Sequence, residues 1–159
     1  MCLKYDKELT TSVLKRFEKG PIKAYKVLRI DKKDVCSSYS HLAETTLWEA
    51  GWNESNRKNV QLTAAELGRK TITKGFHVFL TREGAREDFS YFNTGSDSIY
   101  AIVPVYGYAE HFVAAGFFEP YSYGGWPTGK KGTVSSKTAV FKKLLVKEED
   151  IEKARNKRR

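Results

Sequence analysis

The run IYAIVPVYGY at residues 99–108 constrains the fold of this chain most strongly. Its β-branched and aromatic residues fit the pleated surface of a sheet, and a nearly continuous apolar run is typical of a buried strand. Pro104 interrupts the run and has no backbone N–H to donate to a neighbouring strand. We therefore predict a buried strand, part of which lies at an edge or a bulge of the sheet.

Three other stretches differ in how clearly they indicate strands. IKAYKVLRI at residues 22–30 carries apolar residues on both faces, which indicates a central strand, and the turn cluster DKKD follows it. HFVAAGFF at 111–118 is a further strand candidate, and KTAVFKKLLV at 137–146 is predicted to be the last strand. Residues 36–60 are less regular and are interpreted as a long excursion with a short strand.

Both ends of the chain are predicted to be helical. Near the start, apolar residues recur at a spacing that places them on one helix face, before Gly20-Pro21 ends the pattern. These residues are Leu9, Val13, Leu14 and Phe17. At the other end, KEEDIEKARNKRR is acidic first and basic last, which matches the dipole of a helix.

A strand followed by a capped helix is predicted in the stretch GFHVFLTREGARE. The strand covers about residues 76–80, and Thr81 is well placed as the N-cap of the helix that follows. A second capping pattern, Thr63 with Glu66, predicts a short helix within QLTAAELGRK at 61–70.

The order of these elements predicts a single α+β domain with a mixed, mostly antiparallel sheet flanked by a few helices. A chain of 159 residues is long enough for one domain with a substantial core and too short to expect two. We assign residues 1–146 to this domain and residues 147–159 to a charged C-terminal helix or tail.

The charge of the chain favours a polyanionic partner. It has 28 basic and 19 acidic residues, a formal net charge of +9, and basic surfaces attract nucleic acid with an affinity that falls with salt. The alternative is that the charge serves only solubility. No apolar run approaches a membrane span, and the N-terminus has no signal-peptide pattern. With two cysteines, Cys2 and Cys36, we expect a cytoplasmic protein with reduced thiols and no membrane partner.

Motifs of common enzyme classes do not occur in the sequence. The Cys and His residues show no CxxC or HxxxH spacing, so no metal site is expected. Neither a GxxxxGK[ST] phosphate loop nor a GxSxG nucleophile elbow is present, so the residues alone indicate no cofactor. The sequence favours a binding protein over an enzyme and leaves catalysis open.

Three segments are predicted to bind nucleic acid. The loop 119–133 combines glycines, flat rings that stack on bases and lysines that contact phosphates. The turn GWNESNRKN offers a ring with cations, and the tail KARNKRR adds positive charge. The alternatives are a loop folded onto the core, an ordinary surface turn and a solvated tail. The predicted binding residues are Trp52, Arg57, Lys58, Tyr121, Tyr123, Trp126, Lys130, Lys131, Arg155, Lys157, Arg158 and Arg159.

His77 lies within the strand of the capped unit and admits two interpretations. A histidine on a strand before a helix is a candidate catalytic residue, but a histidine on a half-buried strand is also commonly satisfied by a carbonyl or water. Alternation along the strand places Phe76, Val78 and Leu80 on one face and His77 with Phe79 on the other.

The strands AYKVLRI, IYAIVPV and TAVFKKLLV, with GFHVFLTREGARE between the first two, occur in an order that resembles small ADP-ribosyltransferase-like domains over about residues 22–146. The resemblance implies an enzyme that uses NAD. It implies further that Arg29 or His77 contacts the dinucleotide, that an aromatic side chain such as Tyr100 stacks on it, and that Glu110 orients the ribose.

The chain also resembles small, basic, aromatic-rich accessory proteins of bacteriophages, which implies a host-directed function such as inhibition of a host or defence nucleoprotein complex. Three hypotheses follow. The first is a cytoplasmic accessory protein that binds nucleic acid or a nucleoprotein complex. The second is an NAD-dependent ADP-ribosyltransferase-like enzyme. The third is a protein-binding or virion component without catalysis, whose basic charge meets an acidic protein partner.

Overall fold

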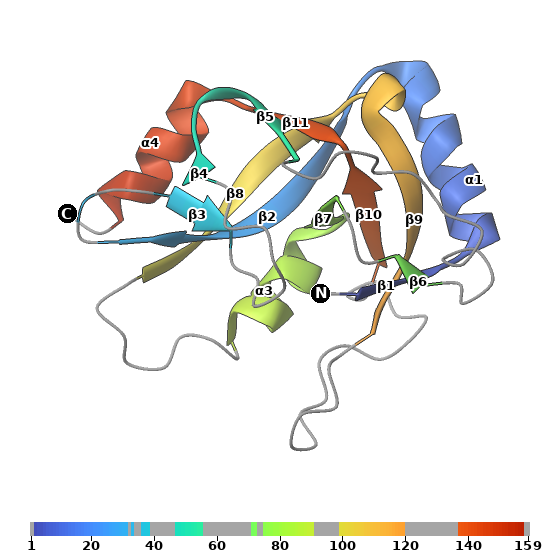
Figure 1. Cartoon of the computed structure of the whole chain (residues 1–159), viewed down its shortest axis with the longest axis horizontal. Helices are drawn as coiled ribbons and strands as arrows, with labels where there is room; N and C mark the ends of the chain where they lie inside the picture. The colour runs from blue at the N-terminus through green and yellow to red at the C-terminus, as the bar shows by residue number, and fades with distance from the viewer. Residues whose placement is uncertain are drawn as a thin grey trace.

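The strands of the chain form one large antiparallel sheet with helices on both faces, an α+β fold as the sequence predicts (Figure 1). The structure is a computed structural model, and it describes residues 2–31, 33, 36–38, 47–55, 71–72, 75–90, 99–119 and 137–157. All strand pairings among these residues are antiparallel.

The bounds of the elements are as follows. Along the sheet lie β5 (Gly51–Glu54), β11 (Lys143–Val146), β8 (Ile99–Gly107), β2 (Ile22–Ile30), β7 (Phe76–Phe79), β10 (Lys137–Phe141), β9 (Phe112–Glu119), β1 (Cys2–Tyr5) and β6 (Thr71–Ile72). Outside this order, β3 (Cys36–Ser38) pairs with β2 and with β4 (Leu47–Trp48). The described helices are α1 (Lys7–Arg16), α3 (Arg82–Ser90) and α4 (Glu148–Asn156), with short 3-10 turns η1 (Phe17–Lys19) and η2 (Ala109–His111).

Strand β2 lies between β8 and β7, as the prediction of a central strand requires, and its longest pairing is with β8. These two strands pair over their whole length, from Ile22 opposite Gly107 to Ile30 opposite Ile99. On its other side, β8 pairs with β11 at a single described position, Leu145 opposite Tyr106. The described residues therefore show a single pairing on that side of β8, and Pro104 lies opposite Tyr25 of β2 on the other side.

The first helix is present as predicted and buries a narrower stripe than expected. The Asp6 carboxylate accepts the Leu9 N–H at 2.7 Å, which caps the helix. Val13 is buried, and Leu9 and Phe17 pack against the same cluster. Leu14 is 50% exposed, so the prediction that it shares this face is wrong. One residue after Val13, it is rotated by about 100° out of the buried stripe.

Helices cover the two faces of the sheet separately. On one face, Val13 of α1 and Ile151 of α4 join the large core cluster that includes the inward-facing residues of β2 and β8. On the other face, Ala85 of α3 packs on Val27 and Phe79. Figure 1 shows α1 and α4 at opposite ends of the molecule with α3 between them. The charged C-terminal segment is a helix as predicted, and its apolar residues belong to the core.

The strand and capped helix around Thr81 are confirmed. The Thr81 hydroxyl accepts the N–H of Gly84 at 3.1 Å, which is the bond that an N-cap makes to the third helical residue. All four residues of β7 are buried, so the helix follows a strand that is enclosed on both faces. The expected helix at 61–70 lies outside the described residues.

Two strand predictions are wrong. Residues 36–60, interpreted as an excursion with a short strand, contain three described strands, β3, β4 and β5. The run at 137–146 is two strands, β10 and β11, which separate at the exposed Lys142. The N–H of Lys142 donates to the carbonyl of His111, and its carbonyl accepts the N–H of Ser55. The chain therefore leaves β7 and β9 and continues between β8 and β5. Lys142 and Lys143 interrupt the apolar run at this point, but the interruption does not specify a change of partners.

None of the described helices is both long enough and apolar enough to pass through a bilayer.

Candidate nucleic-acid interface

A row of side chains crosses four neighbouring strands on the face of the sheet that also carries α3. Register places Lys23 of β2 opposite Tyr106 of β8, Tyr106 opposite Leu145 of β11, and Leu145 opposite Trp52 of β5. Directly opposed residues of an antiparallel sheet point to the same face. With neighbouring strands about 4.8 Å apart, the row extends for roughly 14 Å. Its two ends, Lys23 and Trp52, are exposed.

A tight turn before β5 presents Trp52 to solvent. The buried side chain of Asn53 accepts the N–H of Glu49 at 3.0 Å and donates to the carbonyl of Glu49 at 2.8 Å. Gly51 has a φ of 97°, which favours glycine at this position. Because Asn53 faces inward, the neighbouring Trp52 faces outward and is 50% exposed. The prediction of a surface turn at Trp52 is therefore wrong, because this residue lies within a strand.

The ring of Trp52 packs against two other rings. Tyr108 lies at 5.3 Å between ring centroids with the planes at 52°, and His111 lies at 5.4 Å with the planes at 74°. These contacts are tilted and edge-to-face, the geometries that aromatic pairs prefer, so they fix the orientation of a half-exposed ring. No local pattern in the sequence links Tyr108 and His111 to Trp52, because they are more than fifty residues away from it.

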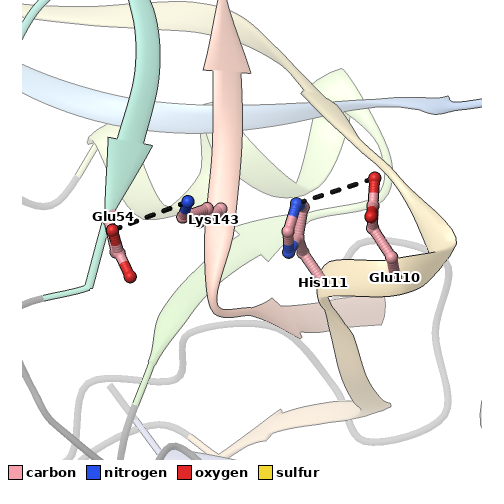
Figure 2. Close-up of polar contacts among 4 residues, drawn as sticks. All are labelled: Glu54, Glu110, His111 and Lys143. Atoms are coloured by element: carbon pink, nitrogen blue, oxygen red, sulfur yellow. Dashed lines mark ion pairs between the residues drawn. The ribbon is translucent and has the colours of Figure 1, made fainter.

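Charged groups surround these rings. Glu54 pairs with Lys143 at 3.6 Å, and Glu110 pairs with His111 at 3.8 Å (Figure 2). Next to Lys23 in the row, the Tyr106 ring lies under the Lys147 ammonium, which is 4.5 Å from the ring centroid. We call this surface the aromatic sheet face. Its residues are Lys23, Trp52, Glu54, Tyr106, Tyr108, Glu110, His111, Lys143, Leu145 and Lys147.

The three residues suggested for an NAD cleft are not brought together. Arg29 lies opposite Tyr100, near one end of β8, whereas Glu110 follows the other end of that strand. The stretch from Tyr100 to Gly107 alone spans roughly 23 Å at about 3.3 Å per residue. His77 lies on β7 opposite Val140 and is buried.

His77 has the contacts of a structural histidine. Its Nδ1 lies 3.1 Å from the carbonyl of Gly75, and its Nε2 lies 3.0 Å from the carbonyl of Ile72. Its own carbonyl accepts a 2.8 Å bond from the buried ammonium of Lys26. Burial, assisted by the charge of Lys26, lowers the pKa of His77 to about 4 although the carbonyls oppose the change. The side chain has no open side toward a substrate.

The other predicted binding residues are only partly described. Arg155 on α4 donates to Glu152 at 2.7 Å, and this bond is the main cause that raises the pKa of its guanidinium. Lys157 is exposed just after α4, which packs on the opposite face of the sheet from Trp52. Nine predicted residues lie outside the described residues: Arg57, Lys58, Tyr121, Tyr123, Trp126, Lys130, Lys131, Arg158 and Arg159.

In the described part of the chain, no three His, Cys, Asp or Glu side chains gather as a metal site would require. Cys36 is buried and is not part of a disulfide. The chain was compared with known proteins, and no family model, no curated protein and no solved structure matches it.

Proposed function

We propose that this protein binds nucleic acid through the aromatic sheet face. The observation that carries the proposal is the half-exposed Trp52, held by Tyr108 and His111 at one end of a row whose other end is Lys23. An oriented ring is a platform on which a base stacks, and such stacking contributes about 1–3 kcal/mol per base. Lysines at the other end would neutralise phosphates.

The net charge of +9 supports the same proposal at longer range. It raises the local concentration of polyanions and speeds their association with the protein. The more specific role that we propose is that of an accessory protein, of the kind bacteriophages encode, which binds a host or defence nucleoprotein complex and inhibits it. The rings would then contact the nucleic acid that such a complex carries.

Fluorescence anisotropy with labelled single-stranded RNA and DNA tests the proposal. Because Trp52 packs on other rings at the surface, Trp52→Ala should leave the fold intact and weaken binding roughly five- to 100-fold, as the loss of one stacked base predicts. Leu47→Ala is the matched control, since Leu47 is also an exposed apolar residue, at 61%, but lies on β4, which pairs with β3. Equal binding by Trp52→Ala and the unchanged protein would overturn the proposal.

A further inference from the structure

We infer, on the basis of the proposed function, that the ligand is a single strand and that Glu54 and Glu110 select bases with an exocyclic amino group. Both carboxylates are well exposed, at 70% and 72% of their side chains. Glu54 is two residues from Trp52 on the same strand face, and Glu110 adjoins the histidine that the Trp52 ring contacts. The stacking platform is therefore flanked by negative charge.

This arrangement separates the phosphates from the base. On the aromatic sheet face, Lys23 and Lys147 lie around Tyr106, whereas Lys143 is paired with Glu54. Repulsion between carboxylates and phosphates is strong within the screening length of about 8 Å at physiological salt. A strand that stacks on Trp52 thus places its phosphates toward Tyr106 and the edge of its base toward Glu54 and Glu110.

A duplex does not satisfy this arrangement. It carries its phosphates on the outside and its bases stacked within, so any approach to Trp52 brings phosphates against the two carboxylates. A single strand can turn one unpaired base onto the ring, as sequence-tolerant proteins with exposed aromatic residues do. Single strands should therefore bind at least tenfold more tightly than duplexes of the same length.

The chemistry of a carboxylate sets the base preference. An ionised carboxylate only accepts hydrogen bonds. Cytosine presents an amino donor at N4, whereas thymine presents a carbonyl oxygen at O4 in the corresponding position. The two pyrimidines have similar size but differ also at the thymine C5 methyl group and at N3, which carries a proton in thymine, so the preference is assigned to the amino group only by removing the carboxylates. We expect oligo(dC) to bind about tenfold more tightly than oligo(dT) at neutral pH, as one good contact of this kind predicts.

The decisive variant is Glu54→Gln/Glu110→Gln. An amide accepts and donates, so it accommodates either pyrimidine, and the loss of two negative charges also releases Lys143 toward phosphates. Affinity for oligo(dT) should rise about tenfold and the ratio of oligo(dC) to oligo(dT) affinity should fall toward one. Glu8→Gln/Glu18→Gln is the control of equal charge, on exposed positions of α1 and η1. It should raise both affinities slightly and leave their ratio unchanged.

The outcomes separate this inference from the proposed function. If oligo(dC) and oligo(dT) bind equally, or a duplex binds as tightly as a single strand, while Trp52→Ala still weakens binding, the inference is wrong and the proposed function stands. A ratio that persists in Glu54→Gln/Glu110→Gln also overturns the inference. If no nucleic acid binds, or Trp52→Ala has no effect, the proposed function itself is wrong.

Discussion

His77 illustrates how one buried side chain sets a response to acid. A neutral imidazole has a single N–H, so it can donate to only one of the two carbonyls, of Gly75 and Ile72, that its nitrogens approach. The imidazolium would donate to both. Burial and the neighbouring charge of Lys26 outweigh this gain, and the pKa is lowered from 6.5 to about 4.

This pKa shift predicts that stability falls as the pH falls from about 6.5 to 4. Within this window the unfolded chain binds a proton at His77 and the folded chain does not, so protonation favours unfolding. Above the window both states are neutral and the effect is absent. The full difference corresponds to about 3 kcal/mol of the free energy of unfolding. Urea unfolding at pH 7 and pH 5 measures the part of this difference, about 2 kcal/mol, that is lost over that interval.

The variant His77→Gln should reduce this dependence on pH, because its amide does not titrate. The same substitution at His111, whose ring lies at the surface against Trp52, is the matched control and should retain the loss of stability in acid. If His77→Gln loses as much stability as the unchanged protein between pH 7 and pH 5, the explanation by a buried neutral histidine is contradicted.

Only glycine fits at position 116 of β9, because the backbone of the neighbouring strand β1 leaves no room for a Cβ atom. A Cβ added at Gly116 would overlap the carbonyl oxygen of Lys4 on the paired strand β1. Because backbone in a paired strand cannot move aside as a side chain does, Gly116→Ala should lower the free energy of unfolding by about 3 kcal/mol. Denaturant unfolding measures this loss, and a change below about 1 kcal/mol would contradict the close approach.

Among the elements, α4 shows that a highly charged segment can still be part of the core. Ile151 is fully buried in the main cluster, although it is surrounded in sequence by acidic and basic residues. Ile151→Ala should cost about 2–5 kcal/mol of unfolding free energy because it leaves a cavity. Lys153→Ala, on the exposed side of the same helix, should have little effect. Equal effects of the two would show that the helix is not docked.

The elements that the sequence predicted are those with local signals. The strand around residues 22–30 and the helix capped by Thr81 follow from composition and from one capping residue. The break at Lys142 does not, because it depends on partners that are distant in the chain, His111 and Ser55. The candidate site divides in the same way. The sequence indicates Trp52 as a binding residue because it is an aromatic residue among polar ones. The ring contacts that orient it depend on strand register, which the local sequence does not show.

For the whole molecule, the dependence of binding affinity on salt distinguishes attraction by the net charge from phosphate contacts at particular residues. Each phosphate neutralised on a single strand contributes about −0.7 to the slope of log affinity against log salt. If Lys23 meets a phosphate beside Tyr106, Lys23→Ala should make this slope less steep by about 0.7. Lys15→Ala is the matched control, since Lys15 is exposed on α1, which packs on the opposite face of the sheet.

Both variants lower the net charge by one. If binding depends only on long-range attraction, Lys23→Ala and Lys15→Ala should therefore change the salt slope equally. Equal changes would contradict binding at the aromatic sheet face. An affinity that is independent of salt would exclude phosphate neutralisation. The third hypothesis, an acidic protein partner, is distinguished by co-purification instead, because salt also screens its attraction to the basic charge. Such a partner would co-purify with the protein before and after nuclease treatment. A nucleic-acid ligand would be lost with nuclease, and the rings of the aromatic sheet face would then be its contact surface.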